Sequence, residues 1–184
     1  MDRRVERTKR HIYLAFFELL KKKPMDEITI TELANAADID RRTFYMHYHT
    51  VIDVYNEFMQ GLQDRLRDLL EASEADGNFD FGHFFDGLST IMESRVEFFE
   101  KLSKDKAFMF LRYDCKEVLD AALQDFYKDR FPGTDAERDA YISMLSYAIT
   151  GHGSDFLIKK QDLGFHDFFA LIIPYLDRIW VPRT

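Results

Sequence analysis

Cysteine, proline and glycine are all scarce in this chain of 184 residues. Cys115 is the only cysteine, so no disulfide can form within the chain, and a single thiol is typical of proteins in a reducing compartment. There are four prolines and eight glycines, and no segment alternates apolar and polar residues as a half-buried strand does. Together these absences predict a helical protein without covalent cross-links.

Long apolar runs are also missing. The longest is about nine residues, around Phe168 to Pro174, whereas a membrane-spanning helix needs about 20. The first residues, Met1 to Arg4, lead into further charged residues instead of the apolar core of a signal peptide. We therefore expect a cytoplasmic protein that makes no use of a membrane.

Aromatic side chains, by contrast, are abundant, with 18 Phe, nine Tyr and one Trp. So many rings in a helical chain indicate a bulky core, a roomy apolar pocket, or both. The length fits one medium domain, or a small domain joined to one of roughly 130 residues.

Charge is distributed unevenly along the chain. The net charge is −8, yet residues 1–50 carry ten Lys and Arg against eight Asp and Glu, a balance of +2. Residues 51–184 carry 15 against 25, a balance of −10. A basic end on an acidic body can dock a polyanion, although the charged, solvated start of a helix has the same composition.

Helix-start and turn signals crowd into the N-terminal part. Residues 4–22 are amphipathic at helical spacing. The segments Thr29–Glu32 and Thr50–Asp53 are capping boxes, in which the threonine hydroxyl caps a helix and the acidic side chain reaches back. Between them, Asp38-Ile39-Asp40 predicts a tight turn whose first residue tolerates a positive φ and whose last residue caps a helix over residues 41–48. This order of helices and turns is the layout of a helix-turn-helix module.

The helix predicted over residues 41–48 is the most informative segment. If Phe44 and Tyr48 are buried, the side chains left near its outer or terminal faces are those of Arg41, Arg42, Thr43, Tyr45, Met46, His47 and His49. Arginine can read guanine with two hydrogen bonds, and Thr, Tyr and His can contact phosphates. A short helix with such a face, second in the motif, fits the major groove of DNA. The alternative is an exposed polar helix that binds no partner. The preceding helix and the basic N-terminal end argue against it.

Three stretches at this spacing resemble the N-terminal signature of TetR-family (tetracycline-repressor-like) transcriptional regulators, namely Ile28–Ala34, Asp38–Asp40 and Thr43–Tyr48. The likeness covers about residues 8–58, and the rest of the chain is similar only in size, helicity and acidity. The resemblance implies an all-α fold in which residues 1–50 form a three-helix, helix-turn-helix DNA-binding domain. Residues 51–184 would form a larger helical bundle that binds a small molecule and dimerises through its final two helices.

The resemblance also implies DNA contacts at individual positions. Thr31 would lie at the phosphate backbone or the groove edge. Arg41, Arg42 and Thr43 would read bases or line the groove edge. Tyr45 and His47 would contact mainly phosphates.

Two positions depart from the family pattern. Asp38 stands where the turn usually has glycine, which implies backbone strain. Val51 stands where the family often has a lysine that touches a phosphate. That contact is either lost or passed to His49, Thr50 or the backbone N–H groups at the helix start.

The C-terminal part offers candidates for a pocket and for a dimer interface. For a pocket between the middle helices, which the resemblance implies, the candidate lining residues are Phe85, Leu88, Met92, Phe99, Leu111 and Tyr147, although core packing is the competing interpretation of each. Gly151 and Gly153 favour close approach of a neighbouring helix. The candidate dimer residues around them are Gly151, Phe156, Phe168, Phe169, Ile172 and Leu176.

Catalytic and metal chemistry find little support. Gly151–Asp155 lacks the preceding strand and the lysine of a phosphate-binding loop. The pairs His83/Asp86 and His152/Asp155 have usable spacing for a metal but are common on polar helix faces. We therefore expect neither an enzyme nor a bound cofactor or metal.

The favoured hypothesis is a homodimeric DNA-binding repressor that a small apolar ligand releases from a palindromic operator. Two alternatives remain open. One is an all-helical carrier or enzyme that keeps an inactive helix-turn-helix, and the other is a DNA-binding regulator switched by a partner protein. Steep salt dependence of DNA binding would distinguish a regulator from a carrier.

Overall fold

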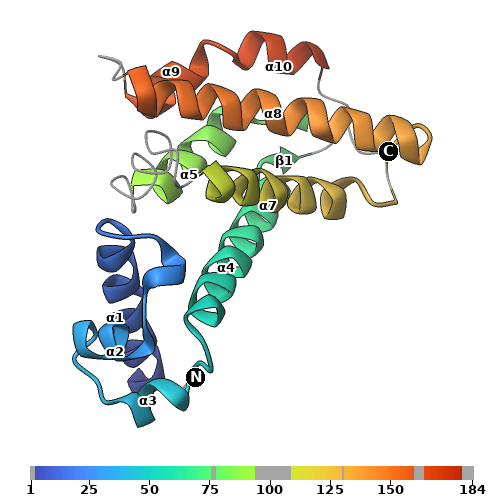
Figure 1. Cartoon of the computed structure of the whole chain (residues 1–184). Coiled ribbons are helices and arrows are strands. Elements are labelled where there is room, and N and C mark those ends of the chain that lie inside the picture. Colours follow the sequence, from blue (N-terminus) through green and yellow to red (C-terminus); the bar gives the residue numbers. More distant parts are fainter. Residues whose placement is uncertain (1–2, 76–77, 94–108, 130, 160–163, 180–184) are drawn as a thin grey trace. The chain divides into compact units, whose positions relative to one another are not determined.

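The computed structural model describes residues 3–75, 78–93, 109–129, 131–159 and 164–179, and they form a helical chain (Figure 1). Strand structure within these ranges is limited to one short antiparallel ladder. The chain divides into two compact units, Met1–Gln60 and Gly61–Thr184. The prediction of an all-α fold is confirmed.

The first unit holds the helix-turn-helix motif. Its elements are α1 (Arg3–Leu20), the 3-10 turn η1 (Met25–Glu27), α2 (Ile30–Ala36), α3 (Arg41–Tyr45) and the start of α4 (Val51–Ala72). Ile12 and Phe16 on α1, Leu33 on α2 and Phe44 on α3 are completely buried and form the core of the unit. Because each helix places its apolar face on the others, the polar face of α3 is directed to solvent.

The start of α4 turns one of its large apolar residues to solvent. The side chain of Ile52 is 43% exposed. Val51, Val54 and Tyr55 are buried instead. Successive helical residues are about 100° apart, so a helix that buries Val51 and Val54 turns Ile52 away from the core.

The second unit takes up the rest of the described chain. Its elements are the remainder of α4, β1 (Glu74–Ala75), β2 (Asn78–Phe79), α5 (Phe81–Glu93), α7 (Met109–Tyr127), α8 (Asp135–Lys159), α9 (Phe165–Ala170) and α10 (Ile173–Ile179). β1 and β2 form a short antiparallel ladder, in which Glu74 pairs with Phe79. No helix among the described residues is long and apolar enough to cross a bilayer.

The last helical segment of the described chain is divided into two helices, α9 and α10. Leu171 and Ile172 form a turn between α9 and α10. Pro174 explains the break, because proline has no N–H to donate and its ring clashes with the carbonyl four residues earlier. In the first turn of α10 the missing N–H is tolerated.

Two glycines allow close packing in the second unit. A Cβ atom on Gly87 of α5 would lie 2.3 Å from Leu69 Cδ1 of α4. A Cβ atom on Gly153 of α8 would lie 3.3 Å from Phe169 Cζ of α9, which confirms Gly153 as a helix-packing position. Gly151 has no atom within 4 Å of such a Cβ, so it is not a packing position within the chain.

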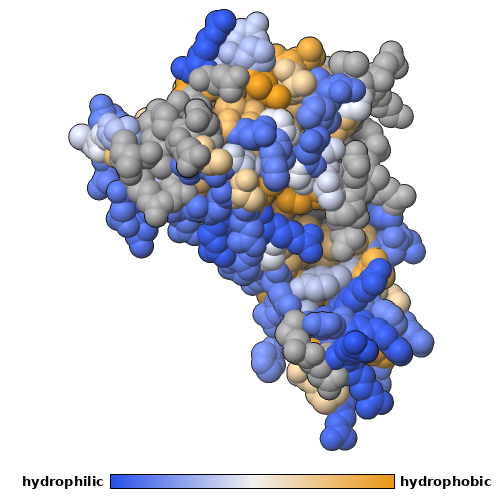
Figure 2. Space-filling view, turned by 180° about the vertical axis from the view of Figure 1, so that it is seen from behind, coloured by the Kyte–Doolittle hydropathy of each residue, from blue (hydrophilic) through white to orange (hydrophobic). Residues whose placement is uncertain are grey.

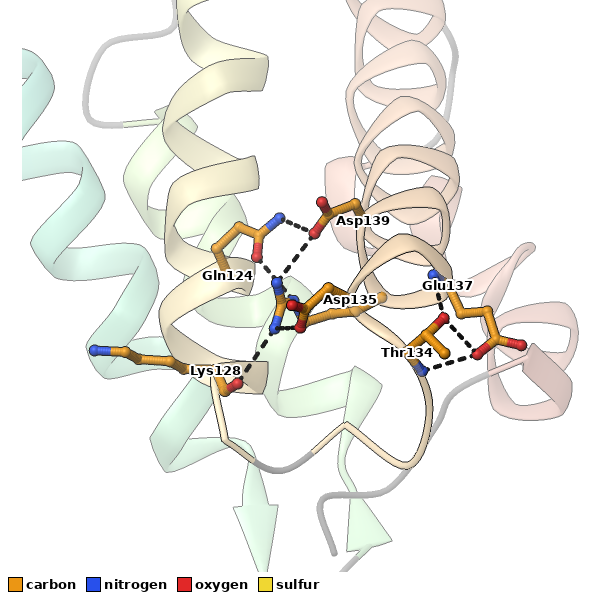
Figure 3. A network of polar contacts seen from close by, with 7 residues as sticks. Gln124, Lys128, Thr134, Asp135, Glu137 and Asp139 are labelled. Carbon is orange, nitrogen blue, oxygen red and sulfur yellow. Dashed lines mark hydrogen bonds and ion pairs between the residues drawn. The ribbon is translucent and has the colours of Figure 1, made fainter.

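Arg138 joins the ends of α7 and α8. Its Nε donates to Gln124 Oε1 (3.1 Å), and its two terminal nitrogens donate to the Lys128 carbonyl (3.3 Å) and to the carboxylates of Asp135 and Asp139 (2.9 and 3.3 Å) (Figure 3). Beside it, Thr134 and Glu137 form a capping box at the start of α8. These contacts fix the turn between the two long helices.

Candidate nucleic-acid interface

The turn between α2 and α3 is a Schellman motif. The N–H of Ile39 donates to the Ala34 carbonyl (3.0 Å), and the N–H of Asp38 donates to the Asn35 carbonyl (3.1 Å). Asp38 has φ 55° and is the only non-glycine residue with a positive φ in the described chain. The predicted left-handed backbone at Asp38 is therefore confirmed, and it directs the chain sharply into α3.

Asp40 starts α3 as predicted. Its Oδ1 accepts the N–H of Thr43 at 2.7 Å, and this hydrogen bond lowers the pKa of the carboxyl. The helix is shorter than the segment expected over residues 41–48, but Met46 and Tyr48 continue it with turn hydrogen bonds to Arg42 and Phe44.

The side chains predicted for DNA contact are accessible on α2, on α3 and on the residues that follow α3. Phe44 and Tyr48 are buried, as predicted. The candidate contact residues are all exposed or half-buried, namely Thr31, Arg41, Arg42, Thr43, Tyr45, His47, His49 and Thr50. An Arg41 terminal nitrogen lies 3.5 Å from the Tyr45 hydroxyl, and its guanidinium carbon lies 6.0 Å from the centre of the Tyr45 ring. Arg41 thus lies along the outer face of α3, where a DNA base or phosphate could contact it.

Met46 belongs to the same face and is 68% exposed. The sequence placed it on this face, but no role was assigned to it. A flexible apolar side chain beside two arginines can contact a thymine methyl group in the major groove. Figure 2 shows that the visible surface of the first unit is otherwise mostly hydrophilic.

The start of α4 is capped by an acidic side chain. Asp53 Oδ2 accepts the N–H groups of His49 and Thr50, each at 2.8 Å, and the Thr50 hydroxyl accepts the N–H of Asp53 at 3.2 Å. These backbone hydrogen bonds lower the pKa of Asp53. The predicted capping box is confirmed, and it occupies two of the N–H groups that were considered as replacements for the missing lysine at Val51.

Basic side chains on α1 extend the positive charge of the first unit. Arg3, Arg4, Arg7 and Arg10 are exposed. Lys9 differs from them because its amine binds the Glu57 carboxylate at 2.8 and 3.0 Å. Much of the exposed positive charge of this unit therefore comes from arginines of α1 and α3.

The pocket candidates of the second unit do not all lie together. Phe85 is completely buried, and its ring lies 4.5 Å from that of Phe169; Leu88 and Met92 are half-buried. Tyr147 was expected with them but is 60% exposed, with the Lys116 amine 4.4 Å from its ring centre. Phe99 and the side chain of Leu111 lie outside the described residues.

Several of the predicted dimer residues are buried within the chain. Phe168, Phe169 and Leu176 are buried inside the chain itself, so they are not available to a partner subunit. Sequence periodicity could not reveal this, because the last helical segment is apolar on nearly all sides. Gly151 is exposed, and Phe156 and Ile172 are half-buried. Among the described residues, the large exposed apolar side chains of α8, of the turn between α9 and α10, and of α10 are Met144, Tyr147, Ile158, Leu171, Tyr175 and Ile179.

Other chemistry is sparse in the described ranges. They contain no group of three or more His, Cys, Asp or Glu side chains that could hold a metal ion. Burial raises the pKa of the Cys115 thiol to about 12, so the reactive thiolate is not formed at neutral pH.

Comparison with solved structures identifies the fold. NalD, the secondary repressor of the MexAB-OprM multidrug efflux pump in Pseudomonas aeruginosa, superposes with a TM-score of 0.60 at 17% identity, over 92% of this chain and 95% of NalD. DhaS, a dihydroxyacetone kinase operon activator, gives 0.58 at 18% identity, over 96% of this chain and 98% of DhaS. Thermus thermophilus FadR, a TetR-family transcriptional repressor solved in complex with lauroyl-CoA, gives 0.54 at 16% identity, over 96% of each chain.

No protein-family model and no curated protein sequence matches the chain. The structural matches span nearly the whole chain, including the helix-turn-helix unit and the helical unit that follows. The chain therefore has the fold of TetR-family transcriptional regulators, as the motif over residues 28–48 predicts.

Proposed function

We propose that this protein is a sequence-specific DNA-binding transcriptional regulator and not an enzyme. The observation that carries the proposal is the outer face of α3, where Arg41, Arg42 and Tyr45 are exposed on a helix whose inner face is fixed by buried Phe44. The major groove is wide enough for such a helix, and each arginine can bind guanine O6 and N7. Regulators that share the fold support this function.

The charge distribution also supports the first unit as the part that binds DNA. Residues 1–50 have a balance of +2 and residues 51–184 a balance of −10. DNA is repelled by the acidic part and attracted only by the basic part. Docking would therefore take place through α1 and α3 and would weaken steeply as salt is added.

A homodimer fits this role, because two copies can place two α3 helices in successive turns of a near-palindromic operator. Exposed apolar side chains support α8 and α10 as the contact surface, with Met144 and Tyr147 on α8 and Tyr175 and Ile179 on α10. Figure 2 shows that the larger hydrophobic areas in that view lie on the second unit. Gly151 is exposed on α8 and would allow a partner helix to approach closely.

A small apolar effector would act in the second unit, near Phe85, Leu88 and Met92. FadR was solved with lauroyl-CoA, which supports an apolar or acyl-chain effector for a protein of this fold. Such a ligand releases DNA only if it binds the released state more tightly, and a coupling of about 1–3 kcal/mol is typical. We propose a repressor in the cytoplasm, in line with NalD and FadR, although DhaS is an activator.

The decisive experiment selects bound sequences from random duplex DNA. We expect a dyad-symmetric sequence with half-sites one helical turn apart or a multiple of it. Arg41→Ala should weaken binding by about 1–3 kcal/mol and relax the preference at one base pair of each half-site. Recovery of no preferred duplex, or unchanged affinity in both Arg41→Ala and Arg42→Ala, would contradict the proposal and favour a carrier that keeps an inactive motif.

A further inference from the structure

Four polar side chains gather inside the first unit, beside the residues that follow α3. They are Lys9 and Tyr13 of α1, Tyr48, and Glu57 of α4, and we call them the Glu57 cluster. The Lys9 amine donates to both oxygens of Glu57, at 2.8 and 3.0 Å, and lies 5.4 Å from the centre of the Tyr48 ring. The rings of Tyr13 and Tyr48 meet edge to face, with their centres 6.5 Å apart.

Glu57 is the only anion of the cluster, and the Lys9 amine donates a hydrogen bond to each of its oxygens. Burial raises the pKa of Tyr13 to about 12 and that of Tyr48 still further, so both hydroxyls stay protonated at neutral pH. Burial also opposes ionisation of Glu57, but Lys9 and the two tyrosines outweigh it and lower the pKa of the carboxyl. A carboxylate is therefore maintained beside one ammonium group and two hydroxyl groups.

The cluster is connected to the DNA-reading face by packed rings. Tyr48 is 3% exposed, and its ring centre lies 5.8 Å from that of Phe44. The Phe44 ring in turn meets the ring of Tyr45 edge to face at 6.1 Å. A displacement of Tyr48 would therefore move Phe44 on the inner side of α3 and Tyr45 on its outer side.

We propose that Glu57, acting through Lys9 and Tyr48, is a positioning residue that sets the orientation of α3 for DNA binding. The proposal rests on the proposed function and adds to it a residue that need not contact DNA. The alternative is that Lys9 and Glu57 form an ordinary surface ion pair whose only effect is on stability. Because Lys9 and Glu57 are 27% and 40% exposed, solvent screens the pair and it adds little to the stability of the fold. A binding site, however, needs its side chains held within about 0.5 Å, so a small shift of α3 has a larger effect on affinity than on stability.

Glu57→Gln tests the proposal through the sign of its effect. The substitution removes one negative charge from the DNA-binding unit, so electrostatics alone would leave DNA binding unchanged or tighter. The positioning role predicts the opposite, because the amide replaces one accepting oxygen with a donor that faces Lys9 and the tyrosines. We expect affinity for the selected duplex to fall by about fivefold or more. Glu57→Gln binding as tightly as the wild type, or more tightly, would overturn the proposal.

Glu18→Gln is the matched control. Glu18 lies on α1 in the same unit and pairs with Lys21 at 2.8 Å, so the variant makes the same change of charge outside the cluster. Its affinity should be unchanged or slightly higher. Tyr48→Leu removes the ring that the Lys9 amine contacts and that packs on Phe44, so it should weaken DNA binding in the same direction as Glu57→Gln. Circular dichroism would establish that each variant is folded, and Tyr48→Leu decides the matter if Glu57→Gln is not.

Hydrogen exchange provides a readout without DNA. The amides of residues 42–48 should exchange faster in Glu57→Gln than in the wild type or Glu18→Gln, while the amides of α2 should be unaffected. If the wild type binds no duplex, the proposed function fails, and the exchange measurement still decides whether Glu57 holds α3. Equal exchange in both variants would contradict the positioning role even if the wild type binds DNA.

Discussion

Gly87 of α5 leaves no room for a methyl group beside Leu69 of α4, because a Cβ atom at this position would lie 2.3 Å from Leu69 Cδ1 and 2.9 Å from Cδ2. Carbon atoms in contact are about 3.5–4.0 Å apart, so Leu69 or the backbone would have to move. Any larger residue at this position would therefore require the Leu69 side chain to move.

We therefore expect Gly87→Ala to lower the free energy of unfolding by about 1–3 kcal/mol, measured by urea denaturation. Gly61→Ala is the control, since Gly61 lies in α4 with no atom within 4 Å of an added Cβ, and alanine there should be neutral or stabilising. Introducing Leu69→Ala first removes the colliding methyl groups and should reduce the cost of Gly87→Ala. The prediction fails if Gly87→Ala is tolerated as well as Gly61→Ala.

A second prediction concerns the behaviour of the helix-turn-helix motif in acid. Hydrogen bonds from the Lys23 amine (2.7 Å) and from the N–H (3.0 Å) and hydroxyl (2.7 Å) of Thr29 lower the pKa of Glu32 from 4.5 to about 2. Because the pKa is lower in the folded state, Glu32 stabilises the fold fully above about pH 4.5, and this contribution is lost as the pH falls through about 2.

Wild type and Glu32→Gln should therefore differ in free energy of unfolding near neutral pH and converge as the pH approaches about 2. An NMR titration of the Glu32 carboxyl gives an independent measurement. A midpoint at or above 4.5 in the folded protein would show that the capping box does not hold the carboxylate as described.

Local signals in the sequence predicted the motif well, because each depends on a few neighbouring residues. The capping boxes at Thr29 and Thr50, the cap at Asp40 and the positive φ of Asp38 are all present. Such features are set by hydrogen bonds over three to five residues, so they follow from the sequence without knowledge of the tertiary structure.

The candidates of the second unit were harder to predict, because burial there depends on how distant helices pack. Phe168 and Phe169 were expected at a subunit interface, yet Phe169 packs on Phe85, more than 80 residues earlier in the chain. Tyr147 was expected in a pocket but is exposed beside Lys116. In a helix that is apolar on most sides, periodicity does not identify the face that is buried.

A third prediction tests the proposed dimer surface. Met144 on α8 is 48% exposed, and Met144→Glu would place a charge in an apolar contact. We expect the variant to sediment as a monomer at concentrations where the wild type is a dimer, and to bind the operator weakly. Leu14→Glu is the control for the sedimentation measurement alone, because Leu14 is 47% exposed and lies outside this surface but on α1, where a new negative charge would itself weaken DNA binding. The same molecular weight in wild type and Met144→Glu would remove α8 from the interface.

The last prediction concerns the turn at Asp38, whose φ of 55° is in the left-handed region that favours glycine. In that region a Cβ atom crowds the following carbonyl, at a cost of about 1–2 kcal/mol for most residues and less for Asp and Asn. Asp38→Gly removes the clash but gives the unfolded chain more freedom, so we expect a net stabilisation of no more than about 1 kcal/mol. Asp38→Val places a β-branched side chain at the same φ. It should destabilise the fold by more than Asp38→Gly stabilises it.

DNA binding gives this pair of variants a second use. Asp38 is exposed and precedes α3, and its carboxylate adds a negative charge near the proposed DNA surface. Asp38→Gly should therefore bind the operator at least as tightly as the wild type, with a gain that shrinks as salt is added. A stabilised Asp38→Gly variant that binds more weakly would mean that the aspartate side chain itself orients α3, and that backbone strain is not the main consequence of having Asp at this position.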